Sequence, residues 1–269
     1  MKKPRVLYIS QEITPYLPES EMATISRYLP QGIQERGREI RTFMPRFGMV
    51  NERRNQLHEV IRLSGMNLII NETDHPLIIK VASIQAARMQ VYFIDNEDYF
   101  QRKAILTDEQ GVEFPDNDER AIFFARGVLE TVRKLRWTPD LVHCHGWFTS
   151  LIPLYLKKVF HDDPLFGHAK VVYSLYQDSF KTPLHETFKQ KIMMPGIKPA
   201  DVDVLTVPDF EHISEMAITH SDAVMIGSKE LNPAVETFLR KSGKPFLEYQ
   251  EPESFVEAYS TFYKDVLGV

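Results

Sequence analysis

Apolar and polar residues alternate along the chain in blocks that predict strands separated by helices. A short apolar run, typical of a strand buried in a parallel sheet, occupies residues 6–10, and further short strands are predicted at residues 40–44, 140–143, 170–175 and 223–226. Helical spacing, with apolar residues recurring every three to four positions, occupies residues 25–33, 119–135, 151–159, 210–220 and 234–241. This alternation predicts an α/β fold, a single Rossmann-like domain whose mainly parallel sheet has helices on both faces.

Two segments depart from this alternation. Residues 55–95 hold several short β-like runs with polar breaks, which predicts a β-rich insertion. The stretch KPFLEYQEPES is a polar connector, and the residues after it place one apolar stripe on a helix, formed by Phe255, Tyr259, Phe262, Tyr263 and Val266. Such a stripe needs an apolar groove. We therefore expect one domain over residues 1–243, with a connector and a C-terminal helix over residues 244–269 that packs back onto it.

Charge and composition narrow the function classes. The net charge of −5 and the pI near 6.0 argue against non-specific nucleic-acid binding and against a basic membrane-surface patch. The single cysteine excludes a disulfide within the chain. No apolar stretch approaches the roughly 20 residues of a membrane span, and the N-terminal apolar run is too short for a signal peptide. We expect a cytoplasmic protein with no nucleic-acid or membrane partner; its oligomeric state is left open.

The stretch PDLVHCHGW places His143, Cys144 and His145 at the end of a predicted strand. Structural zinc needs a tetrahedral ligand set, and the chain has no second cysteine to complete one, so we predict no metal. Neighbouring residues on a strand point to opposite faces, which disfavours a Cys–His catalytic pair and favours Cys144 as a packing residue. Two interpretations stay open for the histidines: a pair in a ligand cleft, or a hydrogen-bonded structural pair.

Several longer motifs occur in a fixed order. They are RVLYISQEITPY at 5–16, GREIRTFMPRFG at 37–48, PDNDERAIFFARGVLE at 115–130, PDLVHCHGW at 139–147 and ITHSDAVMIGSKE at 218–230. In type and spacing, the chain from about residue 4 to 232 resembles the N-terminal half of bacterial glycogen synthases and plant starch synthases, the family-5 glycosyltransferases. The resemblance implies the N-terminal half of a GT-B fold and, in the family, glucose transfer from ADP-glucose to an α-1,4-glucan.

The family's donor-binding loop, Lys-x-Gly-Gly-Leu, is altered. Its positions here are Pro18, Glu19, Ser20, Glu21 and Met22. A lysine neutralises phosphate, and glycines let backbone N–H groups approach a diphosphate. This chain has neither, and its two carboxylates repel a diphosphate. We therefore expect ADP-glucose binding to be lost.

Two other family motifs change in the same way. The family's His-Asp-Trp-His keeps His145 and Trp147, but the aspartate is Gly146. The family's Thr-x-His-Asn, whose histidine contacts the transferred sugar, becomes a segment in which Tyr176 and Gln177 replace the histidine and the asparagine. From the resemblance, we expect that the family's C-terminal Rossmann domain is absent from this chain and that the family's closing helix is kept. No catalytic residue and no cofactor are expected.

These departures favour a non-catalytic module of glucan metabolism that binds α-glucan or a protein partner of glycogen metabolism. The alternative is a glucosyltransferase completed by a separately supplied C-terminal donor domain; a bare interaction scaffold is a third reading. The ligand-cleft candidates are Glu12, Tyr16, His143, His145, Trp147, Tyr176 and Gln177. Tyr16 and Trp147 suit sugar stacking or core packing, and Glu12 suits sugar hydroxyls or a loop cap.

Overall fold

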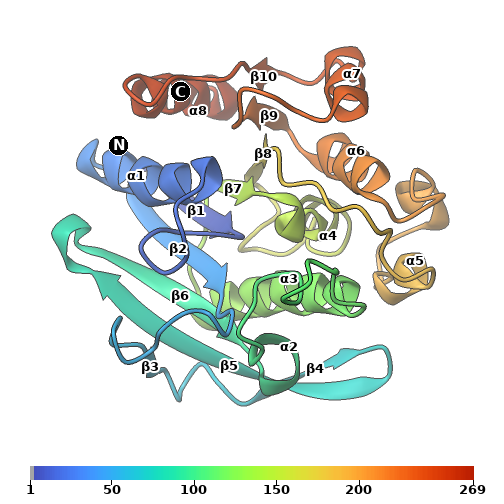
Figure 1. Ribbon diagram of the computed structural model, residues 1–269. Helices are drawn as coiled ribbons and strands as arrows, with labels where there is room; N and C mark the ends of the chain where they lie inside the picture. Colours follow the sequence, from blue (N-terminus) through green and yellow to red (C-terminus); the bar gives the residue numbers. More distant parts are fainter. Residues whose placement is uncertain (1–2) are drawn as a thin grey trace.

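The computed structural model describes residues 3–269 and contains one large mixed sheet between helical layers (Figure 1). Its parallel strands, in spatial order, are β10 (Phe246–Leu247), β9 (Ala223–Ile226), β8 (Lys170–Leu175), β7 (Leu141–His145), β1 (Arg5–Ser10), β2 (Glu39–Pro45) and β6 (Met89–Asp95). The predicted α/β class with a mainly parallel sheet is confirmed.

Between β2 and the following helical segments, the chain extends the sheet with antiparallel strands. The long strand β5 (Thr73–Ile84) pairs with β6, and both β3 (His58–Glu59) and β4 (Met66–Ile70) pair with β5. Residues of β5 alternate between buried and exposed positions over much of its length, as expected for a strand with one face on the core. This is the region in which the sequence indicates β character.

Helices cover both faces of the parallel strands. On one face lie α1 (Glu21–Glu35) and α8 (Phe255–Leu267), which pack on the side chains of Val6 and Tyr8. On the other lie α3 (Asn117–Lys134), α4 (Leu151–Lys158) and α6 (Phe210–His220), with α7 (Pro233–Lys241) beside α6. The short helices are α2 (Glu97–Phe100), α5 (Phe188–Lys191) and the 3-10 turns η1 (Gln85–Ala87), η2 (Trp147–Thr149) and η3 (Pro199–Val202). Among residues 3–269, no helix has the length and apolar character to cross a membrane.

The C-terminal helix α8 lies against α1. It buries Phe255, Tyr259 and Tyr263, and burying a side chain of this size stabilises the fold by about 1.5–3 kcal/mol. The two helices approach closely at Gly32, where an added Cβ would fall 2.4 Å from a methyl carbon of Val256. The apolar stripe of α8 therefore packs into a groove on the face of the sheet that α1 also covers.

Three element boundaries differ from the sequence expectation. Strand β7 runs through His145 rather than ending at residue 143, because Cys144 and His145 pair in register with both β1 and β8. Helix α1 begins at Glu21, earlier than the apolar spacing predicts, so Glu21 and Met22 of the segment predicted to be an altered donor loop lie in its first turn. The polar connector contributes the edge strand β10, which pairs with β9.

Candidate functional site

Strands β1, β7, β8 and β9 are parallel and end at the same edge of the sheet, the position at which open α/β sheets bind ligands. The residues that follow them converge there. Gln11 donates its N–H to the carbonyl of His145 at 3.1 Å, and its side-chain oxygen accepts from Phe148 N at 3.2 Å. Gln177 N donates to Ser228 Oγ at 3.2 Å. The ends of the four strands are thus tied together by hydrogen bonds.

The start of α1 forms one side of this edge. Ser20 is the N-cap: its Oγ accepts from Ala23 N at 3.0 Å and donates to Glu12 Oε2 at 2.8 Å. Glu12 is therefore held by the helix cap. Glu19 and Glu21 flank the cap, are exposed, and have no hydrogen-bond or ion-pair partner within the described chain. The carboxylates of Glu19 and Glu21 therefore lie unpaired, within the described chain, at the start of α1.

A cavity of about 310 Å³ opens beside these carboxylates. Its wall across from the start of α1 comes from the connector, with Tyr249, Gln250 and Pro252, while Ile25 and Phe255 add apolar surface. None of the described residues that line it is lysine or arginine. The cavity is thus apolar with an acidic rim.

Lys229 is the cation that the structure places next to this cavity, and it is already engaged. Its Nζ lies 3.0 Å from a carboxylate oxygen of Glu251 and 5.6 Å from the ring centroid of Tyr249. The ion pair raises the pKa of Lys229, so the ammonium stays charged. Lys229 therefore forms an ion pair with Glu251 and does not face the cavity as an unpaired cation.

His143 and His145 are both fully buried inside the protein, with ring centroids 3.9 Å apart. His143 bonds Tyr263 of α8 at 2.6 Å and Ser174 Oγ at 2.7 Å, and His145 bonds the hydroxyl of Tyr176 at 2.7 Å. Burial lowers the pKa of His145 to about 3 and also lowers that of His143, with a smaller contribution from the neighbouring ring. Both rings are neutral at pH 7 and hydrogen-bonded within the protein, so neither supplies a cation to a ligand.

Gly146 and Asp178 meet just beyond the histidines. Gly146 has a φ of +84°, and an added Cβ would fall 2.7 Å from the terminal methyl of Met22 and 3.0 Å from Asp178 Oδ2. The same oxygen accepts the Trp147 N–H at 2.8 Å. Burial, with Glu12 nearby, raises the pKa of Asp178 to about 7. The carboxyl group of Asp178, from the loop that follows β8, thus lies in the space that a side chain at position 146 would need.

The two aromatic candidates are buried in the core. Trp147 packs edge-on against Phe148, with ring centroids 5.4 Å apart, and close to Phe180. Tyr16 packs edge-on against Phe93 at 4.9 Å.

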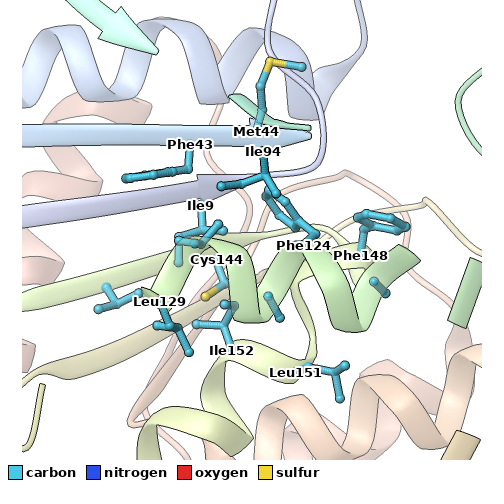
Figure 2. Packing of buried hydrophobic residues seen from close by; sticks show 14 of the residues in the cluster. Ile9, Phe43, Met44, Ile94, Phe124, Leu129, Cys144, Phe148, Leu151 and Ile152 are labelled. Atoms are coloured by element: carbon cyan, nitrogen blue, oxygen red, sulfur yellow. The ribbon is translucent and has the colours of Figure 1, made fainter. Parts of the chain in front are cut away.

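Cys144 is also buried, among the apolar side chains between β7 and α4 (Figure 2), and burial raises its pKa. The thiol is therefore not a nucleophile in this structure. Among residues 3–269, no three His, Cys, Asp or Glu side chains are grouped to hold a metal ion.

Comparison with known proteins identifies the family of this chain. The family model of the starch synthase catalytic domain matches residues 5–239. The chain belongs to the starch synthase catalytic domain family. A glycogen synthase of Chlorobium luteolum is 40% identical over 173 residues, 64% of this chain and 35% of that protein. A glycogen synthase of Chlorobium phaeovibrioides is 32% identical over an alignment that covers 90% of this chain and 56% of that protein.

A solved structure shares the fold of this starch-synthase-like chain. The catalytic domain of starch synthase IV from Arabidopsis thaliana, bound to ADP and acarbose, matches with a TM-score of 0.73 at 15% identity. The match covers 93% of this chain and 52% of that one. The chain thus spans about half the length of the starch synthase structure and of the longer-aligned glycogen synthase.

Of the positions compared with the family's donor loop, Glu19, Ser20 and Glu21 line the cavity, Pro18 is exposed just before them, and Met22 is buried in the first turn of α1. Of the cleft candidates, Glu12 contacts Ser20 at this edge and Gln177 is exposed, whereas the other five are buried: Tyr16, His143, His145, Trp147 and Tyr176.

Sequence reasoning missed Tyr249, Gln250 and Asp178. The first two belong to the connector, and its polar composition gives no sign that it folds over the start of α1. The sequence did offer a sign of Asp178 as a site residue. Asp178 directly follows Tyr176 and Gln177, and glycine stands at position 146, where the family has an aspartate.

Proposed function

We propose that this chain is a glycogen- or starch-synthase-like protein of glucan metabolism that binds α-glucan and has lost ADP-glucose binding. The observation that carries the proposal is the lining of the cavity beside α1, with the carboxylates of Glu19 and Glu21, the ring of Tyr249 and no cation. Carboxylates accept hydrogen bonds from sugar hydroxyls, and aromatic rings pack on the apolar faces of sugars.

The same lining opposes a diphosphate. One like-charge pair about 6 Å apart costs roughly 3 kcal/mol at an effective dielectric near 20. Screening of the exposed Glu19 and Glu21 lowers this to about 1 kcal/mol each, which together weaken binding by an order of magnitude or more. The dipole of α1 favours an anion by up to about 1 kcal/mol, which does not offset two carboxylates.

Loss of glucosyl transfer is supported by Tyr176 and by the same cavity lining. Tyr176 aligns with the family's sugar-contacting histidine. Its hydroxyl is hydrogen-bonded to His145 inside the protein and does not face a ligand. Stabilising a leaving diphosphate needs preorganised cations or dipoles, and none of the described residues lining the cavity is cationic. Transfer by a complex with a separately supplied donor domain is the competing function, and a measured transfer activity would support it.

The proposal is tested by affinity electrophoresis in gels containing glycogen, with Tyr249→Ala as the variant. Removing the ring is expected to weaken glucan binding by about threefold to tenfold. Tyr28→Ala is the matched control, because Tyr28 is a half-exposed tyrosine on α1 that does not line the cavity. No retardation of the parent chain by glycogen, or equal loss in both variants, would contradict glucan binding at this cavity and leave a protein partner as its occupant.

A further inference from the structure

The opposite edge of the sheet contains a notch between β2 and β6. Strand β2 pairs with β1 from Glu39 onward, but with β6 only from Thr42, which lies opposite Val91. Residues 39–41 therefore have a strand neighbour on one side only. A cavity of about 360 Å³ opens at this place. Figure 1 shows the two strands, β2 and β6, side by side. Unpaired backbone at a sheet edge is suited to anion binding.

Arg41 and Arg88 line the notch, and neither forms an ion pair within residues 3–269. Arg41 is held in place: its Nη1 donates to the hydroxyl of Tyr92 at 2.6 Å, and its guanidinium lies 5.3 Å from the ring centroid of Trp137. A guanidinium fixed in this way loses little conformational entropy when it binds a ligand. Arg88 is exposed and free to close over a bound group.

The local charge is unbalanced. Among the described residues that line the notch, Glu39 is the one carboxylate, and both of its oxygens already accept hydrogen bonds. Its two oxygens accept from Arg5 Nε at 3.0 Å and from Trp137 Nε1 at 2.5 Å. Arg5 and Arg41 both contribute to lowering the pKa of Glu39, so together with Arg88 three guanidinium groups stand against one carboxylate, which leaves an excess of positive charge. This excess lies in a chain whose net charge is −5.

We infer that the notch binds a phosphate-bearing small molecule through Arg41 and Arg88. Two planar guanidinium groups match the oxygens of a phosphate, and the side-chain amide of Gln90 can donate to the rest of the ligand. The amide of Gln34 donates one N–H to the carbonyl of Arg88 at 3.5 Å and keeps its second N–H for the ligand. The cavity volume lies within the range of small-molecule sites. The overall negative charge disfavours a nucleic-acid polyanion. This site lies on the sheet edge opposite the proposed glucan cavity, so the two proposals are independent.

Calorimetric titration of the full chain tests the inference, with inorganic phosphate and methyl phosphate as probes at constant ionic strength. Saturable one-to-one binding is expected. Arg88→Gln should weaken it by about tenfold or more, because a charge-assisted contact is removed. The Arg88 side chain makes no hydrogen bond in the described chain, so the variant should keep the parent's circular dichroism spectrum. Arg62→Gln is the matched control, since Arg62 is equally exposed and does not line the notch.

Arg41→Lys separates geometry from charge. It keeps a positive group but removes the planar fork, and it should weaken methyl phosphate binding while leaving the fold intact. Malonate is the carboxylate probe and should bind more weakly than phosphate. Absence of saturable phosphate binding, equal weakening by Arg62→Gln, or tighter binding of malonate than of phosphate would each overturn the assignment.

Discussion

His145→Gln should change how the stability of the protein depends on pH. The ring of His145 is fully buried, and its pKa of about 3 compares with about 6.5 for an unfolded histidine. Between these values the unfolded chain binds a proton that the folded chain does not. The free energy of unfolding therefore falls as pH decreases below about 6.5, by about 1.4 kcal/mol per pH unit. Glutamine can still bond the hydroxyl of Tyr176 but does not titrate.

Urea unfolding of parent and variant between pH 7 and pH 4.5 measures this effect. Relative to the parent, the variant should gain about 2.5 kcal/mol between pH 7 and pH 4.5. Asp178, whose raised pKa gives stability that is present at acid pH and lost as pH rises toward 7, contributes with the opposite sign to both proteins and cancels in the difference. His185→Gln, which changes an exposed histidine, is the control. Parallel curves for parent and His145→Gln would refute the reasoning, because His145 would then accept a proton in the folded state.

The contact between α8 and the rest of the domain gives two further predictions. Gly32→Ala should cost about 1–3 kcal/mol in urea unfolding because its Cβ overlaps Val256, and adding Val256→Ala should recover part of the loss; full stability of the single variant would contradict the close approach. Tyr263→Phe should cost about 1–3 kcal/mol, since it leaves Nδ1 of buried His143 without its partner, whereas Tyr28→Phe at a half-exposed site should change stability by less than about 0.5 kcal/mol. Equal effects of the two tyrosine variants would show that the bond to His143 contributes nothing.

The fold could be predicted from the sequence because strands buried on both faces leave short apolar runs, as at residues 171–173 and 223–226. The limits of β7 could not. His143 and His145 are polar, and they are buried only because partners from other elements satisfy them, among them Tyr263, 120 residues away. Nothing within the local pattern marks that pairing.

The place of the candidate site in the fold was predictable from the sequence, but the contacts of its side chains were not. The position of the altered loop beside a ligand edge follows from the order of strand and helix, since the start of α1 must lie near the end of β1. The inward burial of Trp147 and the arrival of Asp178 next to Gly146 depend on contacts between segments far apart in sequence. So does the position of Tyr249 on the cavity wall. Spacing along the chain carries no information about such contacts.

Side-by-side calorimetry with maltohexaose and ADP-glucose, on the unmodified chain, tests the central claim most directly. The acidic cavity beside α1 predicts saturable heat with maltohexaose and none with ADP-glucose at millimolar concentration. Saturable binding of ADP-glucose, accompanied by transfer of labelled glucose to glycogen without any partner, would contradict the account and show that this chain is a working glucosyltransferase.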